Sequence, residues 1–147
     1  MLTQKFWNYG FRIHLGIVLL ISISAYLGIL PTTPKGILRY DLLGHLVLIG
    51  VLAFFLDGVL HFRPFIPGRF QYIRLAPVII LALAAVEEFA QRFSLRRTSS
   101  LADLFADAIG IVLFSWLAKY VARRYGPEVK IVTHPSPLPG RGKCENL

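Results

Sequence analysis

The sequence predicts an all-α membrane protein, a bundle of four transmembrane helices with up-down topology. Hydrophobic residues make up 55% of the chain and charged residues 16%, against roughly 25% charged residues in a typical soluble domain. Four apolar stretches, at positions 13–30, 42–60, 75–93 and 101–120, each approach the ~20 residues that a helix needs to cross ~30 Å of hydrocarbon. They lack the alternation of strands, so helices are the structures that satisfy their backbone in lipid.

The first apolar stretch follows Lys5 and Arg12, so a cleaved signal peptide is an alternative. The stretch is longer than the roughly 7–15 apolar residues of a signal peptide, and no small-x-small cleavage site precedes Pro31. We therefore expect a retained helix, which ends before the prolines of PTTPKG, Pro31 and Pro34.

The second and third stretches are separated by FRPFIPGRFQ, which is expected to be a loop because prolines and a glycine interrupt it. Asp57 and His61, four residues apart, are expected to form an interfacial pair at the end of the second helix. Beyond the fourth stretch, the chain is rich in Pro and Gly. We expect one transmembrane domain at residues 1–125, followed by a disordered basic tail at residues 126–147.

The formal net charge of +8 does not indicate nucleic-acid binding, because the basic residues flank the apolar stretches instead of forming one patch. Membrane lipids are the expected partners of such flanking charges. The single cysteine, Cys144, excludes an intrachain disulfide and a zinc-type cysteine pair.

Lys and Arg also predict the orientation. With four crossings, the N-terminus, the second loop and the tail share one side of the membrane, and this side carries Lys5, Arg12, Arg63, Arg69, Arg74, Lys119, Arg123 and Arg124. The other side carries fewer basic residues: Lys35, Arg39, Arg92, Arg96 and Arg97. Because cytoplasmic loops hold the excess of Lys and Arg, we expect a protein of the cytoplasmic (inner) membrane with both termini in the cytoplasm. Aromatic residues near that face are expected to form an interfacial belt: Trp7, Tyr9, Trp116 and Tyr120.

Polar residues at the ends of the later stretches are expected at the opposite membrane face. We call this set the polar cluster: Asp41, His45, Glu88, Gln91, Arg97, Asp103 and Asp107. On each helix its members are three or four residues apart and therefore share a face. A lone charge deep in a bilayer costs about 2.5–3.5 kcal/mol on insertion scales, so such groups face the bundle interior, pair or protonate.

Individual members also have structural explanations. Asp103 follows Ser100 in a capping-box-like pattern, and Asp41 is placed to cap the second helix. His45 can be a histidine of the bundle interior whose ring nitrogens are hydrogen-bonded. Arg97 can be a charge at the membrane interface or can bridge the carboxylates of Glu88 and Asp107. Glu87 is expected to be peripheral or paired with Arg92. Ala84 and Gly110 are expected to allow close helix approach.

The stretch EEFAQRFSLRRTSSLADLFADAIG, residues 87–110, resembles the signature of the VanZ-like family of small bacterial membrane proteins. In that family a glutamate is followed three residues later by a glutamine, and an arginine comes six residues after the glutamine. An aspartate comes six residues after the arginine, an Asn or Asp four residues after the aspartate, and a glycine three residues after that. These positions are occupied here by Glu88, Gln91, Arg97, Asp103, Asp107 and Gly110. Upstream, YDLLGH resembles the Asp-Lys-x-x-His motif of the family through Asp41 and His45, with Leu42 in place of the lysine.

The resemblance covers about residues 12–122 and implies the four-helix membrane fold and a polar site. It also implies a link to low-level glycopeptide antibiotic resistance, a property of the family's named member, but it assigns no reaction and no cofactor.

Three classes of function are left open. The first is a cell-envelope protein whose polar cluster binds an envelope lipid headgroup or a cell-wall-related ligand. The second is a membrane-embedded enzyme that is metal-dependent or uses acid/base groups, although no HExxH, serine elbow or phosphate loop is present. The third is a proton-coupled transport subunit, because carboxylates in membranes commonly relay protons. The sequence assigns no oligomeric state.

Overall fold

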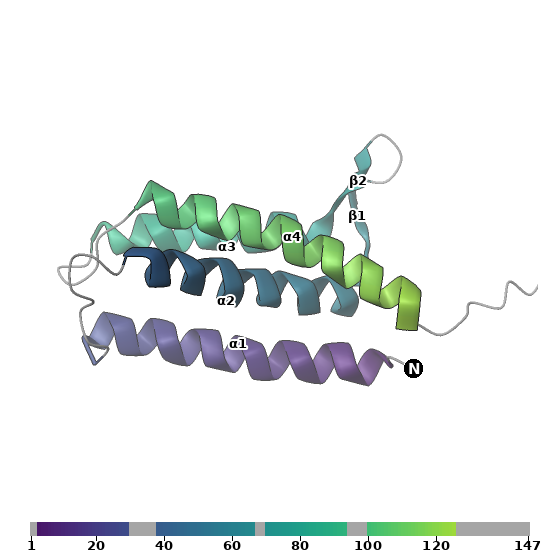
Figure 1. The fold of residues 1–147 in the computed structure, drawn as a ribbon, viewed down its shortest axis with the longest axis horizontal. Coiled ribbons are helices and arrows are strands. Elements are labelled where there is room, and N and C mark those ends of the chain that lie inside the picture. The colour runs from purple at the N-terminus through teal and green to yellow at the C-terminus, as the bar shows by residue number, and fades with distance from the viewer. Residues whose placement is uncertain (1–2, 30–37, 67–69, 94–99, 126–147) are drawn as a thin grey trace, which may run out of the picture.

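The computed structural model describes residues 3–29, 38–66, 70–93 and 100–125. The elements in chain order are α1 (Gln4–Leu27), α2 (Leu38–Val59), β1 (Pro64–Ile66), β2 (Phe70–Arg74), α3 (Leu75–Gln91) and α4 (Leu101–Tyr125). The helices lie lengthwise beside one another, and the two strands project as a hairpin near one end (Figure 1). The described part of the chain is thus mostly helical, with four helices, in agreement with the all-α prediction.

Three of the described helices are long and apolar enough to cross a bilayer: α1, residues Leu42–Val59 of α2, and α4. Helices of this composition indicate a membrane-embedded protein. The helix α3 begins at Leu75, where the third apolar stretch was expected to begin, and has 17 residues. At 1.5 Å per residue it is about 26 Å long, slightly shorter than the hydrocarbon layer.

The helix α1 ends on a glycine, ahead of the prolines that were expected to stop it. Gly28 has a φ of 71°, in the left-handed region that a residue without a Cβ enters freely. Its N–H donates to the carbonyl of Ala25, and the N–H of Ile29 donates to that of Ser24. These bonds satisfy carbonyls that the last turn of a helix otherwise leaves open.

Helix α1 packs against α2 through a buried tryptophan. A Cβ built on Gly58 would lie 2.0 Å from the Trp7 ring, so only glycine at this position admits the indole. The ring centroid of Trp7 is 5.1 Å from that of Phe54 and 6.0 Å from that of Phe62. The expected belt role is therefore wrong for Trp7, which is a packing residue, whereas Tyr9 is exposed as a belt residue would be.

Helix α4 packs chiefly against α2, although α3 precedes it in the chain. A Cβ built on Gly110 would lie 2.1 Å from the carbonyl oxygen of Leu46, and one on Gly50 would lie 2.9 Å from the carbonyl oxygen of Gly110. The two backbones thus approach more closely than any side chain permits. The apolar core lies beside this contact and contains Leu52, Ala53, Leu56, Ala76, Ile80 and Ile111.

The segment between α2 and α3 is a β-hairpin, not the irregular loop that was expected. β1 and β2 pair antiparallel, with Pro64 opposite Arg74 and Ile66 opposite Phe70, and the register shifts between these pairs. The chain reaches β1 through His61 and Phe62, both with a positive φ.

Candidate functional site

The described members of the polar cluster come from three helices and lie at the end of the bundle opposite the hairpin. The start of α2, the end of α3 and the start of α4 meet at this end (Figure 1). Glu88, Gln91, Asp103 and Asp107 are all buried. The expectation that polar residues from different helices converge on one end is met by these residues and by His45.

A direct contact joins α2 and α4 within the cluster. The Nδ1 atom of His45 lies 3.2 Å from Oδ1 of Asp107, and both side chains are largely covered. The contact follows from the local helix packing, because Gly110, one turn after Asp107, lies against the carbonyl of Leu46, the residue next to His45. A carboxylate bonded to a ring nitrogen fixes the orientation of the imidazole, which is a group that can donate, accept or transfer a proton.

Glu88 connects α3 to the first turn of α4. Its Oε1 accepts a hydrogen bond from the backbone N–H of Ser100, and the Ser100 hydroxyl accepts one from the N–H of Ala102 at 3.2 Å. Ser100 therefore caps α4 as expected. In a capping box the N–H of the cap residue bonds to the acid three positions later, here Asp103. In this protein the acceptor of the Ser100 N–H is instead Glu88, which lies on the neighbouring helix α3.

Gln91 brings a further acid into the cluster. This glutamine is 1% exposed, and its Nε2 donates to Oε2 of Glu87 at 2.5 Å. Glu87 was expected to be peripheral or paired with Arg92, but it bonds Gln91, a buried member of the cluster. The guanidinium of Arg92 instead lies 6.0 Å from the ring centre of Phe89. The four-residue spacing of Glu87 and Gln91 was the sequence signal for this bond.

The three remaining members of the polar cluster are Asp103, Asp41 and Arg97. Asp103 is buried in the first turn of α4, where a carboxylate interacts favourably with the helix dipole. The helix α2 begins at Leu38, so Asp41 lies inside its first turn and not at the capping position that was expected; its side chain lies outside the described part of the structure. Arg97 lies outside the described residues, so its bridging of Glu88 and Asp107 stays a prediction.

A second polar contact, at the hairpin end, was not expected from the sequence. Asp57 is 1% exposed, and its Oδ2 lies 2.6 Å from NH1 of Arg74. The NH2 group of Arg74 donates to the backbone carbonyl of Ser115 on α4 at 2.7 Å. The expected interfacial pair of Asp57 and His61 is therefore wrong. The helix ends at Val59, so the four-residue rule no longer relates the two side chains, and His61 is exposed.

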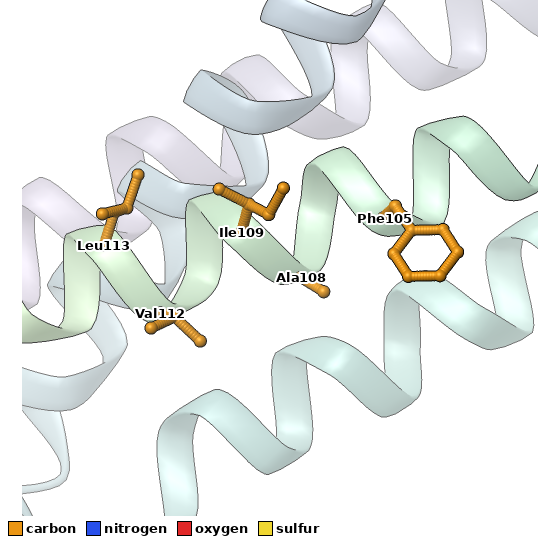
Figure 2. A pocket seen from close by; sticks show the side chains of 5 residues that line it. All are labelled: Phe105, Ala108, Ile109, Val112 and Leu113. Atoms are coloured by element: carbon orange, nitrogen blue, oxygen red, sulfur yellow. The ribbon is translucent and has the colours of Figure 1, made fainter.

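The surface hollows nearest the cluster are apolar. Figure 2 shows one that is lined by side chains of α4 alone, among them Phe105, Ile109 and Val112. A second groove runs between α2 and α4, with Leu42, Leu46, Phe105 and Ile109 in its walls. Leu46 is next to His45 in the chain, so this groove lies beside the His45–Asp107 pair. An acyl chain is the type of group that such a surface accepts.

Within the described ranges, no group of three or more His, Cys, Asp or Glu side chains is arranged to hold a metal ion. The cluster offers acceptors in Glu87, Glu88, Asp103 and Asp107, and donors in His45 and Gln91. Its chemistry is that of a hydrogen-bonding site with an excess of carboxylates.

Comparisons of this chain with protein-family models, with curated proteins and with solved structures gave no match.

Proposed function

We propose that this chain is a VanZ-like integral protein of the cell envelope, which crosses the cytoplasmic membrane four times in up-down order with both termini in the cytoplasm. Three helices of membrane length support this proposal. α3 packs against two of them, α2 and α4, as a fourth crossing would. The excess of Lys and Arg beside the N-terminus, the hairpin and the end of α4 supports the orientation.

We further propose that the polar cluster binds the polar headgroup of an envelope lipid or a related cell-wall precursor. The observation that carries this proposal is the set of buried carboxylates, Glu88, Asp103 and Asp107, gathered with His45 at one end of an apolar bundle. Burial of several acids in a membrane is costly, and their convergence from different helices indicates a role beyond packing.

The described cluster favours a ligand that presents hydrogen-bond donors. Carboxylates accept hydrogen bonds, so an ammonium group or sugar hydroxyls complement them. Arg97, by its position in the sequence, would add a cation for a phosphate of the same headgroup. The apolar groove at Leu46 and Phe105 would receive the acyl chain, so a lipid satisfies both the polar and the apolar surface.

An acid/base enzyme is the second candidate, and the His45–Asp107 pair is the observation that favours it. A carboxylate that orients an imidazole is a common arrangement for general-base catalysis. Proton-coupled transport is less well supported. Between the His45–Asp107 pair and the Asp57–Arg74 pair, α2 and α4 approach closely at Gly50 and Gly110, beside the apolar core.

Native mass spectrometry of the purified protein tests the binding proposal. We expect a co-purified lipid on the wild-type chain and its loss in Asp107→Asn, which keeps the shape of the side chain and removes its charge. Ser115→Ala, eight residues further along α4 and outside the polar cluster, is the matched control and should retain the lipid. A metal ion bound at one per chain would instead favour the enzyme, and equal lipid retention by all three proteins would refute the proposed site.

The link to glycopeptide resistance that the resemblance implies is tested in cells. Loss of the gene should lower the glycopeptide concentration that inhibits growth, and Ser115→Ala but not Asp107→Asn should restore it. Unchanged sensitivity after loss of the gene would contradict the link without affecting the lipid-binding test.

A further inference from the structure

The β1–β2 hairpin exposes apolar side chains on both of its faces. Phe65 is 46% exposed, Ile66 43%, Tyr72 88% and Ile73 47%. Neighbouring residues in a strand point to opposite faces, so each strand presents an apolar group on either side. A hairpin in water normally shows at least one polar face, and a two-stranded hairpin is marginally stable there.

The base of the hairpin is fixed to the bundle. Arg74, the last residue of β2, contacts Asp57 at 2.6 Å and donates to the carbonyl of Ser115 at 2.7 Å. The N–H of Leu75 donates to the carbonyl of Arg63 at 2.9 Å and closes the two strands at their base. The hairpin is therefore held at the level of Ser115 on α4.

The strands run across the direction of the helices and not along it (Figure 1). Helices that cross a bilayer lie roughly along its normal. A segment that runs across them therefore extends along the membrane plane, and it can lie within one layer of the bilayer over its whole length.

The side chains at this level of α4 are typical of a membrane interface. The rings of Trp116 and Tyr120 are stacked with centroids 6.1 Å apart, and both residues are exposed. Lys119, between these two aromatic residues in the chain, and Arg123 and Arg124, just after them, are also exposed. Trp and Tyr concentrate at the headgroup level, and Lys and Arg reach the phosphates beyond it.

From these observations we infer that the β1–β2 hairpin is a lateral anchor that lies in the headgroup layer of the bilayer that the helices cross. Phe65, Ile66, Tyr72 and Ile73 bury apolar surface at the boundary with the acyl chains. The hairpin does not enter the hydrocarbon, because both strands have an unpaired edge whose N–H and C=O groups need water or lipid headgroups. This inference rests on membrane insertion of the helices and is independent of the ligand proposed for the polar cluster.

The test places a fluorescent label at single cysteines in nanodiscs of phosphatidylcholine and phosphatidylglycerol. Cys144→Ser removes the native thiol, and Tyr72→Cys, at the most exposed hairpin position, carries an NBD group. Ile17→Cys, exposed in the middle of α1, is the reference for hydrocarbon, and NBD-labelled N-acetylcysteine in buffer is the reference for water. Ile66→Cys, on β1, repeats the measurement on the other strand.

We expect the labels at positions 72 and 66 to be quenched by aqueous iodide several-fold less than the free label. We also expect a nitroxide near the lipid headgroup to quench them more than one deep in the acyl chain, with the reverse order for position 17. Iodide quenching equal to that of the free label would overturn the inference, because the hairpin would then lie in water. Stronger quenching by the deep nitroxide would also overturn it, because the hairpin would then lie in hydrocarbon.

Discussion

Gly110 on α4 lies so close to Leu46 on α2 that a Cβ at position 110 would be 2.1 Å from the Leu46 carbonyl oxygen. The oxygen belongs to the backbone of a helix, so it cannot move aside without moving α2. This contact sets the spacing of α2 and α4 one turn from the His45–Asp107 pair.

Gly110→Ala should therefore separate the two helices and lower the thermal stability of the purified protein in detergent, by about 1–3 kcal/mol as for other overpacked positions. Gly44→Ala is the matched control on α2, because a Cβ there would meet nothing within 4 Å. If Gly110→Ala melts at the temperature of the wild type, the close packing of α2 and α4 is incorrect.

Glu88→Ala should loosen the start of α4, because the Ser100 N–H loses its acceptor. Loss of one partner of a buried hydrogen bond costs about 1–3 kcal/mol. Hydrogen exchange of the amides at Ser100 and Ala102 should become faster in Glu88→Ala than in Glu88→Gln, which keeps an acceptor oxygen. Equal exchange in both variants would mean that Glu88 does not cap α4.

Arg74→Gln should destabilise the hairpin end of the bundle, since it leaves the carboxylate of Asp57 buried without its cation. Breaking a buried ion pair typically costs about 3–5 kcal/mol. Adding Asp57→Asn removes the unpaired charge and should recover part of the loss in thermal stability.

The exposed Arg63, just before β1, supplies the control for this experiment. Arg63→Gln should change stability by less than about 0.5 kcal/mol. A double variant that is less stable than Arg74→Gln alone would contradict the ion pair.

Topology reporters test whether α3 crosses the membrane. Fusions at Arg63 and Tyr125 should report the cytoplasm, and fusions at Ile29 and Phe93 should report the opposite side. The motivation is the uneven distribution of Lys and Arg. Reporters at Arg63 and Phe93 on the same side would show that α3 does not cross, and all four signals reversed would show the opposite orientation.

Composition and the lengths of the apolar stretches predicted the helices and the end of the bundle at which the polar cluster lies. The sequence determines both features, because helix positions depend on local composition and successive helices run in opposite directions. Glu88 and Asp107 were expected at similar depth with His45 just above them, whereas in the structure Asp107 contacts His45 and Glu88 contacts Ser100. The contact between His45 and Asp107 depends on the close approach of α2 and α4 at Gly110.

The pairing of helix faces was harder to predict. A membrane helix is apolar all round, so no polar stripe indicates which side packs inward. Trp7 was therefore assigned to the lipid interface although Gly58 accommodates its ring. Asp57 was assigned to the surface for the same reason, since its partner Arg74 is distant in sequence. The hairpin was missed because Pro and Gly residues, which are typical of loops, occur in and between its two short strands, on either side of PGR.

The packing of α4 against α2 has a consequence for how the protein is made. Helices emerge from the ribosome in chain order, so α2 is synthesised well before α4. Asp57 can meet Arg74 as soon as the hairpin follows α2, but His45 and Gly50 gain Asp107 and Gly110 only when the last described helix arrives. During synthesis the nascent chain must therefore keep one face of α2 accessible within the insertion machinery, and the central seam of the bundle closes late.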